Sequence, residues 1–152
     1  MEENKLALIQ TEVEKFFKEL NFLVEVKVTE DLELDLLNVQ VESEEAASLI
    51  GYHGENLQAI QTILSFLVHK ALGEWVRVNV NIGDYRQKRE EQLQKLALNL
   101  AMKAKFSGET QTIPNLSSTE RRIVHMELAQ REDILTESIG QGEDRRVVIK
   151  PK

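Results

Sequence analysis

The stretch Leu49-Ile50-Gly51-Tyr52-His53-Gly54-Glu55-Asn56-Leu57 decides how the first part of this chain folds. Two glycines three residues apart interrupt a pattern of apolar residues that has helical spacing on both sides. Such a pair lets the backbone approach a ligand closely, and it leaves the first N–H groups of the next helix facing outward, where a phosphate can bind. An ordinary helical corner also needs a glycine, so the elements around the loop have to decide its role.

Apolar periodicity predicts six elements around this loop. The alternation in the second strand changes parity at Leu36–Leu37, so we expect a bulge or a twist there. Ser43 is the expected N-cap of the short helix that leads into the loop. We expect helices and strands over 3–20, 22–28, 33–41 and 43–50, then a helix from the loop to residue 72 and a strand over 76–82.

This order of elements resembles the type II KH fold, in which a Gly-x-x-Gly loop clamps single-stranded nucleic acid over about four nucleotides. The central pair is Tyr52–His53, where KH loops often carry Lys or Arg. Phosphate contact would then rest on backbone N–H groups, in a weak clamp that Tyr52 assists by stacking. The resemblance implies RNA contacts from Ile50, Gly51, Tyr52, His53, Gly54 and Asn56.

Gly83–Asp84 is the expected boundary between two domains, 1–83 and 84–152. Asp84 is a suitable N-cap for a long helix, and Ser117-Ser118-Thr119-Glu120 has the pattern of a capping box. Together with the first domain this makes an α+β chain. The elements expected in the second domain are a helix over 84–105, a strand over 110–113, a helix over 117–130 and a hairpin of 135–139 with 146–149.

The two expected domains differ in net charge. Residues 1–83 have a formal balance of −9 and residues 84–152 a balance of +2, which together make the −7 of the chain. An acidic protein repels polyanions overall, but salt screens charges beyond about 8–10 Å. A local basic patch in the second domain can therefore still bind nucleic acid, with modest and strongly salt-dependent affinity.

Several classes of protein and site are disfavoured by composition. The chain has no cysteine, which excludes disulfides and thiolate metal sites. No apolar run approaches the roughly 20 residues that span a membrane, and the N-terminus does not have the pattern of a signal peptide. We therefore expect a cytoplasmic protein without direct membrane insertion. The three histidines fall in different elements, so we expect no catalytic site, metal or cofactor.

Arg121 and His125 are four residues apart on the predicted helix and so share a face. The nearby guanidinium disfavours the imidazolium form, so the pair offers a permanent cation beside a neutral ring. Ile123, Val124 and Leu128 are expected to anchor the helix in the core. From spacing alone, an exposed arginine beside a structural histidine is the favoured interpretation.

The segments Ser118–His125, Thr136–Ser138 and Arg145–Lys152 resemble the Arg-x-x-x-His nucleic-acid-binding domain. Preceded by the Gly-x-x-Gly unit, residues from about 20 to 152 resemble the bacterial Jag (SpoIIIJ-associated) family of RNA-binding proteins. This resemblance reverses the interpretation of the Arg-His pair. It implies RNA contacts in the second domain from Arg121, Arg122, His125, Arg145, Arg146 and Lys150.

The resemblance also implies a function. A family member is expected to be a non-enzymatic protein that binds single-stranded RNA, as a post-transcriptional regulator or RNA chaperone linked to cell-wall synthesis and cell shape. A small KH-only protein and a second copy of the chain are possible partners. Many members carry a further N-terminal domain, whose role the resemblance does not imply for this chain. The alternative is a protein-interaction or assembly module, in which the acidic first domain binds a protein and only the second domain touches nucleic acid.

Overall fold

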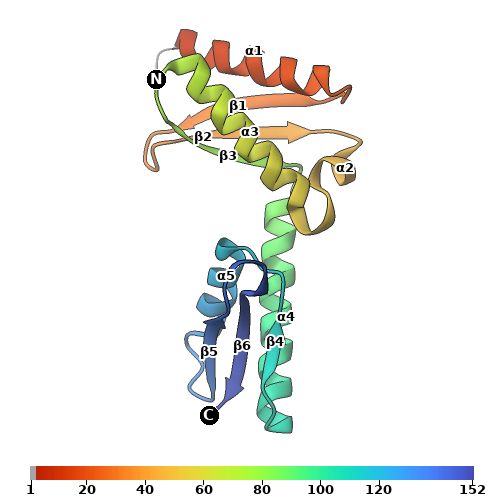
Figure 1. Ribbon diagram of the computed structural model, residues 1–152, viewed down its shortest axis with the longest axis vertical. Coiled ribbons are helices and arrows are strands. Elements are labelled where there is room, and N and C mark those ends of the chain that lie inside the picture. The colour runs from red at the N-terminus through yellow and green to blue at the C-terminus, as the bar shows by residue number, and fades with distance from the viewer. Residues whose placement is uncertain (1–2) are drawn as a thin grey trace. The chain divides into compact units, whose positions relative to one another are not determined.

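The computed structural model describes residues 3–152 (Figure 1). The contacts within the chain divide it into two compact units, Met1–Arg86 and Gln87–Lys152. The division falls two residues into the long helix α4 (Tyr85–Ser107). Among the described residues, no helix is both long enough and apolar enough to cross a bilayer.

The first unit has the predicted order of elements around the Gly-x-x-Gly loop. Its three strands form one sheet in the order β1-β2-β3, in which β2 pairs antiparallel with β1 and parallel with β3. β3 is therefore an edge strand. The elements are α1 (Glu3–Glu19), β1 (Glu25–Asp31), β2 (Leu36–Glu42), α2 (Ala46–Ile50), the single turn η1 (Tyr52–Gly54), α3 (Glu55–Leu72) and β3 (Arg77–Ile82).

Helices α1 and α3 cover one face of this sheet (Figure 1). Fully buried side chains such as Phe17 of α1 and Leu64 of α3 meet Val39 and Val80 of the central and edge strands. The other face carries polar side chains, where amides bond across β2 and β3. One of these bonds joins Asn79 to Asn38 over 3.0 Å. The apolar periodicity of the sequence thus predicts the face that the helices cover.

Of the two alternatives predicted at Leu36–Leu37, a bulge or a twist, the bulge is wrong. The β1–β2 ladder is uninterrupted from Asp31 opposite Leu36 to Glu25 opposite Glu42. Residues 32–35 form a turn instead of strand, because the Asp31 carboxylate accepts the N–H groups of Glu33 and Leu34, each over 3.0 Å. The change of parity in the sequence therefore marks the start of β2.

The predicted cap of α2 is also wrong. The N-cap residue is Glu45, and its side chain makes no capping hydrogen bond. The Ser43 hydroxyl accepts the Glu45 N–H over 3.1 Å and donates to the Leu23 carbonyl over 2.9 Å. Ser43 thus ties the chain before β1 to the turn that leads into α2.

The second unit is a three-stranded antiparallel sheet packed against α4 and α5. The strand order is β4-β6-β5, and the predicted hairpin is present as β5 and β6. Val124 and Leu128 of α5 are buried and Ile123 is partly buried, as predicted, against Val147 and Ile149 of the central strand. The elements after α4 are β4 (Gln111–Ile113), α5 (Ser118–Leu128), β5 (Ile134–Ile139), the turn η2 (Gly142–Asp144) and β6 (Arg146–Pro151).

Candidate nucleic-acid interface

The Gly-x-x-Gly loop is held from one side by Asn56. The Asn56 amide donates to the Ser48 carbonyl over 2.8 Å and so ties the first turn of α3 to α2. A Cβ atom at Gly51 would lie 2.6 Å from Cγ of Asn56, and the backbone there has φ 72° and ψ −173°. Both the close contact and this backbone conformation require glycine. Asn56 therefore acts on the loop as a positioning residue.

The tip of the loop exposes two aromatic rings in front of the start of α3. Tyr52 is 68% exposed, and its ring stacks on that of His53 with centroids 4.0 Å apart. The α3 helix begins after Gly54, which supplies no side-chain cap. The Glu55 N–H donates to the Tyr52 carbonyl. The next N–H groups of the first turn have no side chain from the cap position in front of them, which suits a phosphate oxygen. Ile50 lies behind the loop, partly buried against the core.

His125 of α5 is held by two hydroxyl groups of β5. Its Nδ1 lies 2.8 Å from Oγ1 of Thr136, and its Nε2 lies 2.7 Å from Oγ of Ser138. Burial lowers the pKa of His125, and the charge of Arg121 lowers it further. The ring is therefore neutral and fixed, with both nitrogens already bonded. Thr136 and Ser138 had no assigned role in the sequence, although hydroxyls two apart on a strand share a face.

The partial burial of His125 between Thr136 and Ser138 makes the stability of the second unit depend on pH. Because the folded pKa of His125 lies below its ordinary value of 6.5, the unfolded chain takes up the proton at a higher pH than the folded chain. The contribution is present above about pH 6.5 and is lost as the pH falls through the lowered folded pKa. We expect the free energy of unfolding of the wild type to exceed that of His125→Gln most at neutral pH.

Urea titrations of both proteins between pH 7.5 and 5.5 measure this difference. His53→Gln, which removes an exposed loop histidine, controls for the loss of a ring elsewhere. A difference between wild type and His125→Gln that grows on acidification would contradict the assigned direction.

Three arginines near His125 have N–H groups that are not used in hydrogen bonds among the described residues. Arg121 is half-buried and donates from Nη1 to the Leu116 carbonyl over 2.7 Å, which uses one of its five N–H groups. Arg122 is exposed on α5, and Arg145 is exposed just before β6. Neither side chain is in any ion pair or hydrogen bond found within residues 3–152. These guanidinium groups are therefore open to an anion.

Arg146 and Lys150 lie on the opposite face of the same sheet. Thr136 and Ser138 face α5, so Leu135 and Ile139 face away from it, and these two pair with Lys150 and Arg146. The Lys150 ammonium is also paired with the Glu137 carboxylate over 2.7 Å. By alternation, the extended residue Arg145 points to the α5 side. We call the side of the sheet that carries α5 and His125 the α5 face. Of the basic residues predicted at the C-terminus, Arg145 is thus the one on the α5 face.

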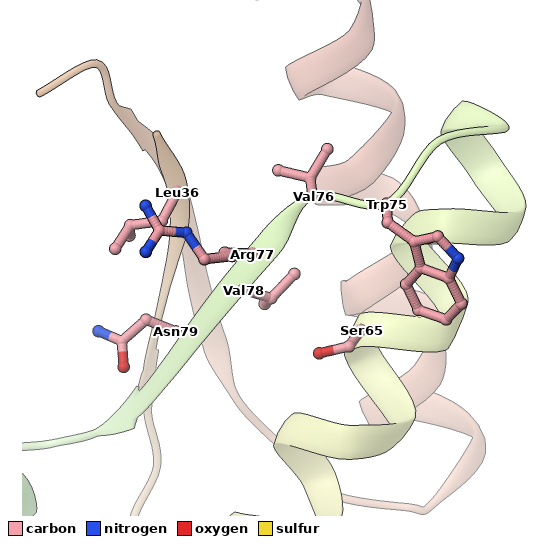
Figure 2. A pocket seen from close by; sticks show the side chains of 7 residues that line it. All are labelled: Leu36, Ser65, Trp75, Val76, Arg77, Val78 and Asn79. Carbon is pink, nitrogen blue, oxygen red and sulfur yellow. The ribbon is translucent and has the colours of Figure 1, made fainter. Parts of the chain in front are cut away.

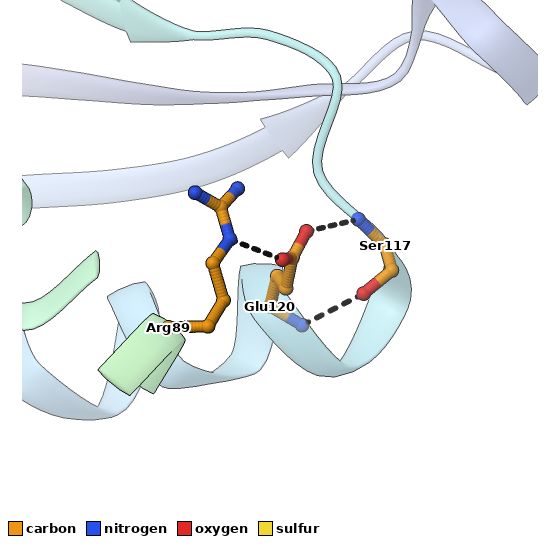
Figure 3. A network of polar contacts seen from close by, with 3 residues as sticks. All are labelled: Arg89, Ser117 and Glu120. Atoms are coloured by element: carbon orange, nitrogen blue, oxygen red, sulfur yellow. Dashed lines mark hydrogen bonds and ion pairs between the residues drawn. The ribbon is translucent and has the colours of Figure 1, made fainter. Parts of the chain in front are cut away.

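Glu120, the acidic neighbour of Arg121, is fully engaged elsewhere (Figure 3). One carboxylate oxygen accepts Nε–H of Arg89 over 2.7 Å, and the other accepts the Ser117 N–H over 3.0 Å. The Ser117 hydroxyl in turn accepts the Glu120 N–H over 3.2 Å, which completes the predicted capping box. Arg89 thus neutralises the carboxylate that would otherwise compete for Arg121 and Arg122.

Removing Arg89 should cost more stability than removing the cap. Both partners of the Arg89–Glu120 pair are only 15–16% exposed, so Arg89→Met strands a half-desolvated carboxylate at a cost of about 2–4 kcal/mol. Ser117→Ala should cost about 1 kcal/mol. Urea titrations followed by circular dichroism compare the two, and an Arg89→Met cost below that of Ser117→Ala would contradict the assignment.

Comparison with known proteins matches both units. The family model "KhpA/KhpB, KH domain" matches residues 8–82, and the model of the Arg-x-x-x-His domain matches residues 91–151. A protein of Clostridium symbiosum named RNA-binding protein KhpB is 30% identical over 140 residues, which are 92% of this chain and 63% of that protein. The Bacillus subtilis protein of the same name is 37% identical over 117 residues, which are 74% of this chain and 55% of that protein.

This chain belongs to the KhpB/Jag family. Its fold is α+β, a KH domain followed by an Arg-x-x-x-His domain, which confirms the predicted family and fold class. A relative from Streptococcus pneumoniae, also named RNA-binding protein KhpB, is 29% identical over 83% of this chain and 38% of that protein. The chain therefore spans 38% to 63% of the length of these three KhpB proteins.

The KH domain has a second surface feature away from its loop. A hollow of about 500 Å³ lies along the start of β3, lined by Leu36, Ser65 and residues 75–79 (Figure 2). The Trp75 indole is 63% exposed and stacks on His69 with centroids 4.0 Å apart, and Phe66, which is 59% exposed, meets it edge to face. Trp75 is thus a surface residue, and none of the predicted RNA-contacting residues lines this hollow.

Proposed function

We propose that this chain is a non-enzymatic protein that binds single-stranded RNA through its KH loop and through the α5 face of its Arg-x-x-x-His domain. The observation that carries the proposal is this α5 face. A neutral, fixed His125 lies there beside Arg121, and Arg122 and Arg145 are exposed without a carboxylate partner among the described residues. Free guanidinium groups bind phosphate, while a fixed neutral ring stacks on a base.

The KH loop supplies the second part of the proposed site. Its contacts are the exposed rings of Tyr52 and His53 and the N–H groups of the first turn of α3 that follow Glu55. The loop has no lysine or arginine and lies in a domain with a balance of −9. We therefore assign it the weaker share of the affinity, through backbone N–H groups and stacking.

The names of the KhpB relatives support RNA as the ligand. The family resemblance further supports a cytoplasmic role as a regulator or RNA chaperone in cell-wall synthesis and cell shape, with a small KH-only protein as a partner. We propose these roles for this chain, together with the domain limits 1–83 and 84–152.

A competition experiment tests the class of ligand. Fluorescence anisotropy with a labelled single-stranded RNA of about a dozen nucleotides should show binding at low salt that unlabelled single strands compete away. A duplex of the same length should compete poorly, because its bases are stacked inside and cannot meet His125 or Tyr52. Equal competition by the duplex would mean that the protein binds only the phosphates. Absence of binding to the labelled RNA would reject the proposed RNA-binding function.

The exposed aromatic pair in the KH domain favours a second candidate function, protein assembly. Phe66 and Trp75 are each more than half exposed beside an apolar hollow, and such patches mark protein interfaces. Phe66→Ser with Trp75→Ser should then change the oligomeric state in light scattering, or the binding of a KH-only partner, with RNA affinity kept. RNA affinity lost in parallel with unchanged assembly would count against this second function.

A further inference from the structure

The edge of β3 near the KH loop is covered by two side chains. Because β3 is an edge strand, every second residue turns its N–H and C=O away from β2. At Val80 both groups are taken up by the KH domain itself. Its N–H donates to Oε1 of Gln61 over 3.1 Å, and its carbonyl accepts Nε–H of Arg86 over 2.8 Å.

Arg86 is half-buried in this position and has no carboxylate partner among the described residues. Its Nη2 donates to the same Gln61 oxygen over 2.7 Å, so both of its recorded acceptors are neutral. No ion pair of Arg86 is found within residues 3–152. Burial lowers the pKa of the guanidinium, against a smaller opposing effect of Tyr85, yet an arginine stays charged in proteins. A partly desolvated cation without a counter-charge is costly, unless a ligand completes it.

The position of this pair relates it to the loop. Tyr85, next to Arg86, is the residue that a Cβ atom at Gly54 would touch, at 3.1 Å. Gln61 follows Gly54 by seven residues on α3, which is about 10 Å along the helix. An RNA strand that the loop holds over about four nucleotides can therefore reach Arg86 and Gln61.

Arg86 and Gln61 offer only hydrogen-bond donors to an RNA strand. The Gln61 oxygen is already used twice, so its NH₂ group remains. Arg86 has used two of its five N–H groups, so three remain. The complementary ligand has two adjacent acceptors. Among bases, guanine presents O6 and N7, the edge that arginine binds most often, whereas adenine replaces O6 by a donor.

On the basis of the proposed RNA binding, we propose that Arg86 and Gln61 form a guanine-recognition subsite at the edge of β3. The base edge supplies the partner that the guanidinium lacks. A phosphate has the same acceptor chemistry, but it would give no preference between bases.

The test compares variants of the whole chain on repeats of UUG, UUA and UUI in fluorescence anisotropy. Inosine keeps O6 and N7 of guanine. The wild type should prefer UUG and UUI over UUA by about tenfold. Gln61→Glu keeps the acceptor for Val80 and gives Arg86 a carboxylate, but removes the NH₂ donors. It should abolish the preference without lowering the thermal midpoint.

Arg86→Lys should also reduce the preference, since lysine retains the charge but lacks the planar guanidinium that donates two parallel hydrogen bonds. Arg77→Lys is the matched control, because Arg77 donates to the Leu34 carbonyl from the same strand and should keep the preference. A wild type with equal affinity for UUG and UUA, or a preference that survives Gln61→Glu, would overturn the subsite while leaving RNA binding intact. Equal losses on all three RNAs would overturn it in favour of a phosphate contact. Absence of RNA binding by the wild type would reject the proposed function itself.

Discussion

Replacing Tyr52 and His53 by aspartate should weaken binding of single-stranded RNA to the full chain by tenfold or more. Both side chains are exposed at the loop tip, so two carboxylates would face the phosphates in front of α3. Like charges placed against each other in an interface cost several kcal/mol. The exposed positions should leave the thermal midpoint almost unchanged, although aspartate at position 53 must adopt the φ of 51° found there.

A double replacement of Tyr52 and His53 by asparagine is the matched control. Asparagine tolerates the positive φ at residue 53 and adds no charge. This variant loses only the stacked rings, and we expect a smaller decrease, of about 1 kcal/mol or roughly fivefold, the lower end of the stacking free energy of one base. Anisotropy titrations at fixed salt measure both. Unchanged affinity of the aspartate variant would reassign the KH domain to a role without RNA contact.

Removing Arg121 and Arg145 together should weaken RNA binding far more than removing Arg146 and Lys150 together. Each double alanine variant deletes two positive charges from the same domain, so the change in net charge is matched. The first pair lies on the α5 face beside His125, while the second pair lies on the opposite face, where Lys150 is held by Glu137. Arg121→Ala/Arg145→Ala should lose about a hundredfold or more in affinity, since two charge-assisted contacts are removed and each is worth about 1.5–3 kcal/mol.

The salt dependence separates a lost contact from a loss of stability. Each phosphate contact to a single strand adds about 0.7 to the slope of log K against log salt. The slope should therefore fall by about 1.4 in Arg121→Ala/Arg145→Ala and stay near the wild-type value in Arg146→Ala/Lys150→Ala. Equal slopes for the two variants would show that the faces are not distinguished by RNA.

The sequence predicts the elements of this fold well because their apolar periodicity is strong. Strands β2 and β3 alternate clearly, with Leu37, Val39 and Val41 buried in β2. The errors lie where one polar side chain redirects the backbone. Asp31 closes the turn that removes the expected bulge, and Ser43 bonds to Leu23, twenty residues earlier, instead of capping α2. Such hydrogen bonds depend on tertiary position, which periodicity does not encode.

The candidate site is predictable in part for the same reason. Helical spacing places Arg121 beside His125, but the hydroxyls that hold the ring come from another element, and only the pairing of β5 with β6 separates Arg145 from Arg146 and Lys150. Arg86 gives no distinct signal in the sequence, because it is one of several charges at the start of a long helix. Its bonds to Val80 and Gln61 require β3 and α3 to be in place.

We propose that both domains contact single-stranded RNA, the KH domain through its loop and the second domain through its α5 face. Anisotropy of a labelled single strand tests this with the wild type and with a variant that combines Tyr52→Asp, His53→Asp, Arg121→Ala and Arg145→Ala. We predict that the wild type binds at about 50 mM salt and weakens linearly in log salt, while the combined variant stays folded and shows no saturable binding. A combined variant that binds as the wild type does, or a wild type that fails to bind at low salt, would contradict the account.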